Sequence, residues 1–274
     1  MKSFAEQSIA WLVITSIVAV VTSYLTYKFI KHQEIIDTVK EQVRADILRE
    51  IHRSNLETEK SKTDRIRRES LKWANPILGS VKDLNFRLNN ILESEGYLAL
   101  STNYQAQINP NWSVTYDYFT NSTLYLFSQY FAWMRMLQED ISFEIFQSPA
   151  EKEKFFQAID NVGHALRSFP PHYSCTGKDM QVFALQQRAI GELLIISEDN
   201  SKRCMTYPEF LIKLKKDTEF KKHLTPLKSL IENINPSDDC RWKRLTLTRN
   251  RLTELVNECE NLLAIIKKTG ERQL

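Results

Sequence analysis

The sequence is poor in glycine and proline, with six and eight of them in 274 residues. Sheet-rich folds need both residue types in their many turns, so this scarcity favours long helices. No stretch alternates apolar and polar residues over a length that would predict a strand. The sequence therefore predicts an all-α fold whose main part is an irregular multi-helix bundle.

The sequence also lacks the short motifs that identify common enzymes. It has no G-x-S-x-G, Walker or G-x-G-x-x-G segment. Its five histidines include no pair spaced three or four residues apart, so a helical zinc pair is not expected. The net charge of only +3 leaves no footprint for nucleic acid. We expect no metal, no cofactor and no nucleic-acid partner, and nothing in the sequence is recognisably catalytic.

Charge is absent from one long stretch, Gln7–Tyr27. Its 21 residues would form a helix about 31 Å long, close to the thickness of the hydrocarbon core of a bilayer. We predict that residues 7–27 contact the lipid bilayer as a single transmembrane helix, inside an anchor over residues 1–28. A cleaved signal peptide is the alternative, with Val21-Thr22-Ser23 as its cleavage site.

The basic residues around this stretch predict its orientation. Lys2 precedes it, whereas Lys28, Lys31, Lys40 and Arg44 follow it. Lysine and arginine near the ends of a membrane helix collect on the cytoplasmic side. The prediction is a single-pass membrane protein with its N-terminus outside and its body in the cytoplasm. Under the signal-peptide alternative the body is secreted.

The four cysteines form no C-x-x-C pair and match no zinc spacing. They are Cys175, Cys204, Cys240 and Cys259. A cytoplasmic body would keep them as reduced thiols.

A charged segment over residues 29–65 follows the anchor. Five apolar residues recur in it at spacings of 3, 4, 4 and 4, namely Ile36, Val39, Val43, Ile47 and Ile51. This spacing places them on one face of a helix, with charged residues on the other faces. We interpret the segment as a helical stalk, either a short coiled coil that joins copies of the chain or a solvated spacer.

The body over residues 66–274 is predicted to be helical throughout. Pro76 predicts a kink or a restart in the first helix, and an Asn-Pro turn is expected at Asn109-Pro110. A second helix is apolar or aromatic on nearly every face, so we place it in the core. The expected helices cover about 64–92, 114–146, 149–169, 179–196, 207–216, 218–234 and 239–268.

One polar constellation stands out in the body. Arg188 and Glu192 are four residues apart on an expected helix and can form an ion pair. Gly191 between them suggests that another backbone passes close, because glycine inside a helix costs about 1 kcal/mol relative to alanine. One interpretation is a buried ion pair that fixes helix packing. The other is that the two residues belong to a polar pocket in which Arg188 holds an anion.

Further polar residues lie among apolar residues of the expected helices, either as a satisfied internal network or in a cavity shared with the pair. The full candidate cluster is Arg87, Asn90, Gln129, Gln187, Arg188 and Glu192. A separate basic cluster suggests a surface that contacts anions, or a merely solvated helix face. It consists of Arg241, Lys243, Arg244, Arg249 and Arg251.

Three segments in order carry a resemblance to a known set of proteins. They are RLNNIL at Arg87–Leu92, TLYLFSQYFAW at Thr123–Trp133 and QRAIGE at Gln187–Glu192. The chain resembles an uncharacterised family of bacterial and fungal helical proteins with RLYNIL-like, TLY..QY..W and QRAIGE-like segments, and departs from it at Asn89. The resemblance implies one all-α body and supplies no activity.

Two functions follow as expectations. The first is a membrane-anchored interaction or scaffold module that faces the cytoplasm and binds a protein partner or itself. The alternative is a membrane-tethered enzyme or ligand sensor with a polar pocket around Arg188 and Glu192.

Overall fold

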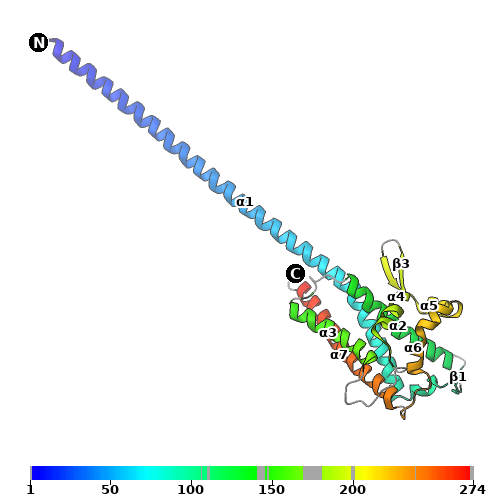
Figure 1. Ribbon diagram of the computed structural model, residues 1–274. Helices are drawn as coiled ribbons and strands as arrows, with labels where there is room; N and C mark the ends of the chain where they lie inside the picture. Colours follow the sequence, from blue (N-terminus) through cyan, green and yellow to red (C-terminus); the bar gives the residue numbers. More distant parts are fainter. Residues whose placement is uncertain are drawn as a thin grey trace. The chain divides into compact units, whose positions relative to one another are not determined.

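The computed structural model describes residues 2–105, 107–109, 112–140, 146, 148–168, 181–198, 201–237 and 239–271. The chain divides into two units, Met1–Thr63 and Asp64–Leu274 (Figure 1). The second unit is a helical bundle with one apolar core, so the prediction of an all-α body is confirmed.

The first unit consists of the N-terminal part of α1 (Lys2–Glu93). Its described side chains are exposed, including those on the predicted stalk. Within the described part of the chain, none of the helices is both long enough and apolar enough to cross a membrane. The side chains of residues 7–10 and 12–14, which belong to the predicted anchor, lie outside that described part.

The C-terminal part of α1 belongs to the second unit and carries a buried stripe: Ile77, Val81, Leu84, Leu88 and Ile91. Their spacing of three and four residues places them on one face of the helix. Pro76 lies inside α1, so of the two predicted outcomes, a kink or a restart, the restart is wrong. The chain leaves α1 through Glu95, which has a left-handed φ of 58°, and continues into the 3-10 helix η1 (Gly96–Leu100).

The aromatic helix α2 (Tyr116–Asp140) lies in the core as predicted, with Phe127, Tyr130 and Phe131 buried. It packs against α4 (Ala184–Leu193), α5 (Tyr207–Lys216) and α6 (Thr218–Ile231). Asp217 caps α6 by accepting a hydrogen bond from the Phe220 amide at 2.9 Å.

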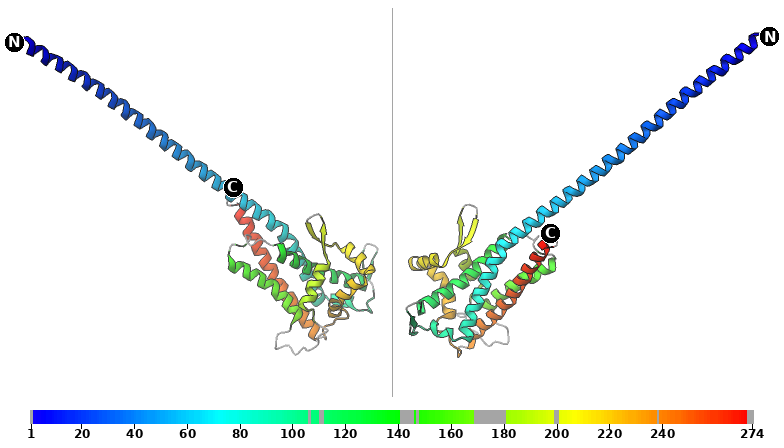
Figure 2. Two further views of the ribbon diagram at one scale, coloured as in Figure 1. Left: turned by 45° about the horizontal axis from the view of Figure 1, so that its top comes forward. Right: turned by 180° about the vertical axis from the view of Figure 1, so that it is seen from behind.

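Helices α3 (Pro149–Arg167) and α7 (Asp239–Glu271) run side by side in every view (Figures 1 and 2). Ser148 caps α3, because its Oγ accepts a hydrogen bond from the Glu151 amide at 3.2 Å. Pro149 occupies the first turn, where its missing amide hydrogen costs nothing.

Two antiparallel hairpins correct the expectation that the body is helical throughout. The strands β1 (Gln107–Asn109) and β2 (Trp112–Val114) form one, and β3 (Ile195–Glu198) and β4 (Ser201–Cys204) form the other. Each strand has three or four residues, too few for an alternating pattern to show. The predicted turn at Asn109-Pro110 involves Pro110, which is outside the described residues. The prediction of a fourth helix over 179–196 is wrong at both ends, because residues 181–183 are not helical, Phe183 is the N-cap, and α4 covers only Ala184–Leu193.

Candidate functional site

Helices α2 and α4 cross in close contact at the site, and Gly191 makes this possible. A Cβ atom placed on Gly191 would lie 2.8 Å from the carbonyl carbon and oxygen of Phe131, and 3.1 Å from the amide nitrogen of Ala132. No side chain fits at such distances. The prediction that a second backbone passes close to Gly191 is therefore confirmed.

A pocket of about 190 Å³ lies beside this crossing, between α2, α3 and α4. Its walls include the buried side chains of Tyr130, Phe131, Met134 and Ile159. Polar residues complete the lining: Arg135, Gln138, Asp160, Arg167, Gln187 and Arg188. The lining is therefore mixed, with a small apolar wall and somewhat more polar than apolar surface.

Gln187 ties α3 to α4 at the edge of this pocket. Its Nε2 donates to the carbonyl oxygens of Gly163, at 3.0 Å, and of Val182, at 2.7 Å. Because Gln187 is buried, these two hydrogen bonds satisfy both protons of its amide. Gly163 itself faces the pocket, and a Cβ there would lie 3.1 Å from Oε1 of Gln187.

Arg135 on α2 links the pocket to two carboxylates. Its Nη2 lies 2.8 Å from Glu139, and its Nε lies 3.1 Å from Glu192 on α4. Glu139 also accepts a hydrogen bond from Lys202 of β4 at 2.8 Å, which together with Arg135 lowers the pKa of the Glu139 carboxyl. These four residues join α2, α4 and the β3–β4 hairpin.

The structure corrects the expected pair of Arg188 and Glu192. Glu192 pairs with Arg135 instead, and both Glu192 and Arg188 are exposed. Among the described residues, Arg188 has no ion-pair partner. The interpretation as a buried ion pair that fixes helix packing is therefore wrong, whereas Arg188 does line a pocket.

The other members of the predicted cluster do not converge on this pocket. Arg87 donates through Nη1 to the carbonyl oxygen of Phe119, at 3.2 Å, and to the hydroxyls of Ser122 and Thr123, at 3.0 and 2.9 Å. Its guanidinium also stacks 4.2 Å from the centre of the Phe119 ring. For Arg87, the structure therefore matches the interpretation of a satisfied internal hydrogen-bond network, and not that of a cavity shared with Arg188 and Glu192. Asn90, Gln129 and Glu192 are likewise absent from the pocket lining.

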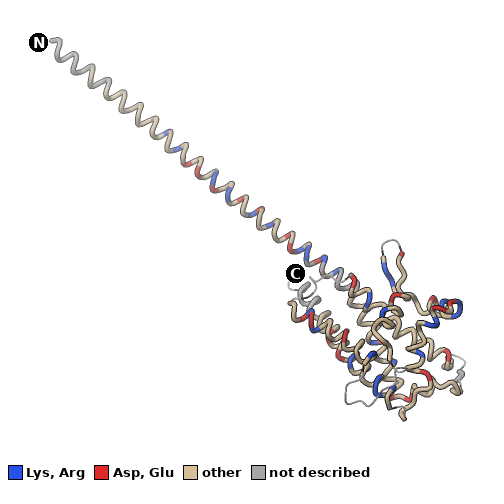
Figure 3. The backbone as a smooth tube through the Cα atoms, viewed as in Figure 1, with Lys and Arg blue, Asp and Glu red and all other residues tan. Residues whose placement is uncertain are grey.

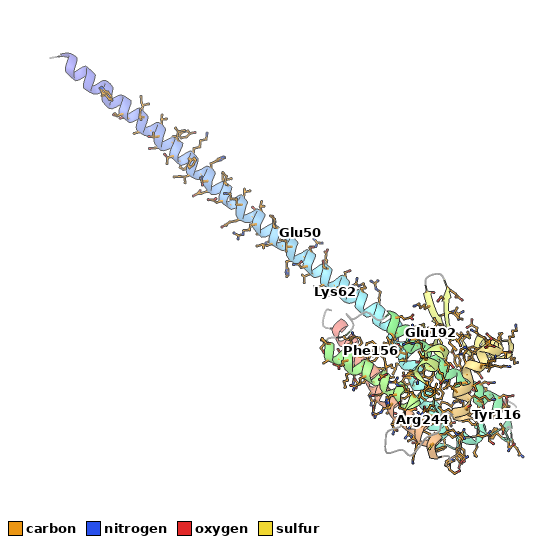
Figure 4. All side chains as sticks on the ribbon, viewed as in Figure 1. Glu50, Lys62, Tyr116, Phe156, Glu192 and Arg244 are labelled. Carbon is orange, nitrogen blue, oxygen red and sulfur yellow. The ribbon has the colours of Figure 1, made fainter. Side chains whose placement is uncertain are left out.

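Most residues of the predicted basic surface make contacts within the fold. Arg244 is completely buried, and its Nη1 donates to the carbonyl oxygens of Ala165, at 2.8 Å, and Ser168, at 3.3 Å, at the C-terminus of α3. A cation at this end of a helix is favourable because the helix dipole is negative there. Burial lowers the pKa of Arg244 to about 10, which leaves the group charged at neutral pH. Arg244 and Glu192 lie in different parts of the body (Figure 4).

The remaining basic residues have varied surroundings. Arg241 donates to the carbonyl oxygens of Ser229 and Glu232, at 3.0 and 2.7 Å, and so caps α6. Arg249 pairs with Glu93 of α1 and Arg251 with Glu254. Lys243 is half-buried. A shared anion-contacting face is therefore not formed.

Among the described cysteines, Cys240 differs from the expectation of reduced thiols, because it is disulfide-bonded. Cys204 and Cys259 are free. Burial raises the pKa of each of these two thiols to about 12, so neither is a reactive thiolate at neutral pH. Cys175 lies outside the described residues.

Sequence reasoning missed the contribution of α3 to the site. Arg167 donates to both carboxylate oxygens of Asp160, at 3.1 and 3.3 Å. The two residues are seven apart, which is two helical turns, so the spacing alone could have indicated a shared face. Lys202 gave no such signal, because its partner Glu139 is 63 residues away in the chain.

Comparison of the chain with protein-family models, curated proteins and solved structures gives no match.

Proposed function

We propose that the chain is a membrane-anchored interaction module that self-associates through the stalk. The charge-free stretch Gln7–Tyr27 supports the anchor through its length and composition. The observation that carries the self-association is a row of exposed apolar side chains on α1: Ile36, Val39, Val43, Ile47 and Ile51.

This row has the geometry of a helix–helix interface. Its members are 41% to 54% exposed, and their spacing keeps them on one face. Charged residues of both signs alternate along the same part of α1 (Figure 3). Pairs within the helix, such as Arg53 with Glu57 at 3.1 Å, balance these charges, so two copies would not repel each other strongly.

The occupant that fits this row is a second copy of the same chain in parallel. Two copies anchored in one membrane present the same row at the same height, which favours pairing in register. Steps of 3, 4, 4 and 4 residues average more than the 3.6 residues of one turn, so the row favours a right-handed supercoil over the left-handed heptad form.

A matched pair of substitutions tests the self-association. Val43→Asp places a charge inside the row, whereas Ala45→Asp places the same charge about 200° away around the helix. Light scattering of the full chain in detergent, corrected for bound detergent, should give a dimer or larger for the wild type and for Ala45→Asp, and a smaller species for Val43→Asp. A monomeric wild type, or an unchanged Val43→Asp, would refute the proposal.

The distribution of lysine and arginine supports a cytoplasmic body, whereas the disulfide at Cys240 favours the alternative of an oxidising compartment. We propose the cytoplasmic location. Treatment of intact cells with a membrane-impermeant thiol reagent, followed by lysis and a permeant one, tests it. Cys204 is half-buried, so the permeant reagent is added after denaturation. The two free thiols, Cys204 and Cys259, are expected to be labelled only by the permeant reagent. Labelling of Cys204 by the impermeant reagent in intact cells would place the body outside.

The pocket between α2, α3 and α4 favours a second candidate function, that of a ligand sensor. Its specific support is the combination of buried apolar walls with Arg188 at the rim. Arg188 belongs to the polar pocket expected from the sequence, and Glu192 contributes only indirectly, by holding Arg135.

A further inference from the structure

The charges around the pocket leave one positive charge without compensation. Arg135 and Lys202 face Glu139 and Glu192, so that group of four is neutral. Arg167 and Asp160 neutralise each other. Among the described residues at the pocket, Arg188 therefore supplies the single excess charge.

The size and the lining of the pocket limit which ligand can bind next to the charge of Arg188. A cavity of about 150 Å³ lined by apolar side chains accommodates benzene. At about 190 Å³, this pocket has room for a body of that size together with one small polar group. Phosphate alone would leave the apolar part of the wall uncovered.

We propose that this pocket binds a small organic monocarboxylate with an apolar body of about six carbons, and that Arg188 pairs with its carboxylate. The inference rests on the second candidate function, the ligand sensor, and specifies the class of its ligand. Arginine suits the role because its planar guanidinium can donate two parallel hydrogen bonds to one carboxylate. The apolar body would rest on Met134 and Ile159, and the bound ligand would then contact α2, α3 and α4 together.

Isothermal titration calorimetry of the full chain in nanodiscs tests the proposal with three probes: benzoate, its neutral counterpart benzamide, and inorganic phosphate. Benzoate should bind saturably at one site, and benzamide at least about tenfold more weakly, because it lacks the charge-assisted hydrogen bonds. Arg188→Gln should weaken benzoate binding by about tenfold or more. Arg251→Gln is the matched control, since it removes an arginine paired with Glu254 on α7, and it should leave binding unchanged.

A second variant blocks the pocket without touching its charge. Ala184 is exposed at the first turn of α4 and lines the pocket, so Ala184→Leu should fill the mouth without disturbing the core. It should weaken benzoate binding while the melting temperature of the body stays within about 2 °C of the wild type.

Equal binding of benzoate and benzamide, or unchanged binding by Arg188→Gln, would overturn the proposal. Binding of phosphate in place of benzoate would overturn the proposal that the ligand is a carboxylate, but it would still support a ligand sensor. Absence of any saturable binding to the wild type would overturn the carboxylate inference, and self-association measured by light scattering would report separately on the module function.

Discussion

Gly191 and Gly79 should respond in opposite ways to the same substitution, alanine for glycine inside a helix. Taken alone, each change should stabilise a helix by about 0.5–1 kcal/mol, because glycine loses more backbone entropy on folding. A Cβ on Gly79 would have nothing within 4 Å, so Gly79→Ala should show this gain undiminished.

At Gly191 the surroundings reverse the sign. The new methyl would lie 2.8 Å from the carbonyl group of Phe131, where ordinary contacts begin at 3.4 Å, so α4 would have to retreat by about 0.6 Å. The opposing atoms are backbone atoms of α2 and cannot rotate away. Overpacking costs about 1–3 kcal/mol, and a backbone contact belongs at the upper end of that range. After the helix gain is subtracted, Gly191→Ala should destabilise the body by about 1–2 kcal/mol.

Thermal unfolding of the full chain measures both effects, with the fluorescence of Trp133 and Trp242 reporting on the body. One kcal/mol corresponds to about 2–4 °C in a domain of this size. Gly191→Ala should therefore melt about 3–6 °C below the wild type and Gly79→Ala about 2–3 °C above it. If Gly191→Ala melts at or above the wild type, α2 and α4 are not in direct backbone contact at Gly191.

Two further predictions follow from polar contacts. The hydrogen bonds from Arg203, followed by those from Thr206, lower the pKa of Glu209 to about 2 from a model-compound value of 4.5. The stability contributed by this carboxylate is therefore present above pH 4.5 and is lost as the pH falls towards 2. Glu209→Gln should flatten that part of a plot of melting temperature against pH. A plot as steep as that of the wild type would contradict this prediction. Arg244→Met should destabilise the body by about 2 kcal/mol in urea unfolding, because two carbonyl groups at the end of α3 lose their donor. Arg251→Met, at a surface pair, should change stability by less than about 0.5 kcal/mol, and equal losses in both variants would refute the capping role.

The sequence was informative where the signals are local. Helix α5 begins and ends at the predicted residues, Tyr207 and Lys216. Its start is marked by a capping box in which Glu209 accepts hydrogen bonds from the amide and hydroxyl of Thr206, at 2.7 and 2.8 Å. The core position of α2 was also predictable from a local signal, its composition, because an apolar helix without a polar face has to be buried.

Contacts between distant segments were beyond the reach of the sequence. The residues Ile195 and Ile196 look like the continuation of a helix, yet they pair with Cys204 and Arg203 in the β3–β4 hairpin. The buried position of Arg244 depends on how α7 lies against α3, and the residues around it look like a solvated basic face. A single sequence carries no register for such pairings.

The orientation of α4 was contained in the sequence only in part. Gly191 had to face a neighbouring backbone, and residues on its face recur three and four positions away. Gln187, four residues before Gly191, and Leu194, three residues after it, satisfy that spacing and are buried, and Ile190 is buried one turn before Leu194. Arg188 and Glu192 are turned about 60° and 100° from Gly191, to the side opposite these buried residues. The glycine alone did not decide this, because Arg188 also lies three residues from it, and it is the burial of the opposite side that excludes a buried ion pair of Arg188 and Glu192. The same rotation places Glu192 beside Arg135 and leaves the charge of Arg188 at the mouth of the pocket.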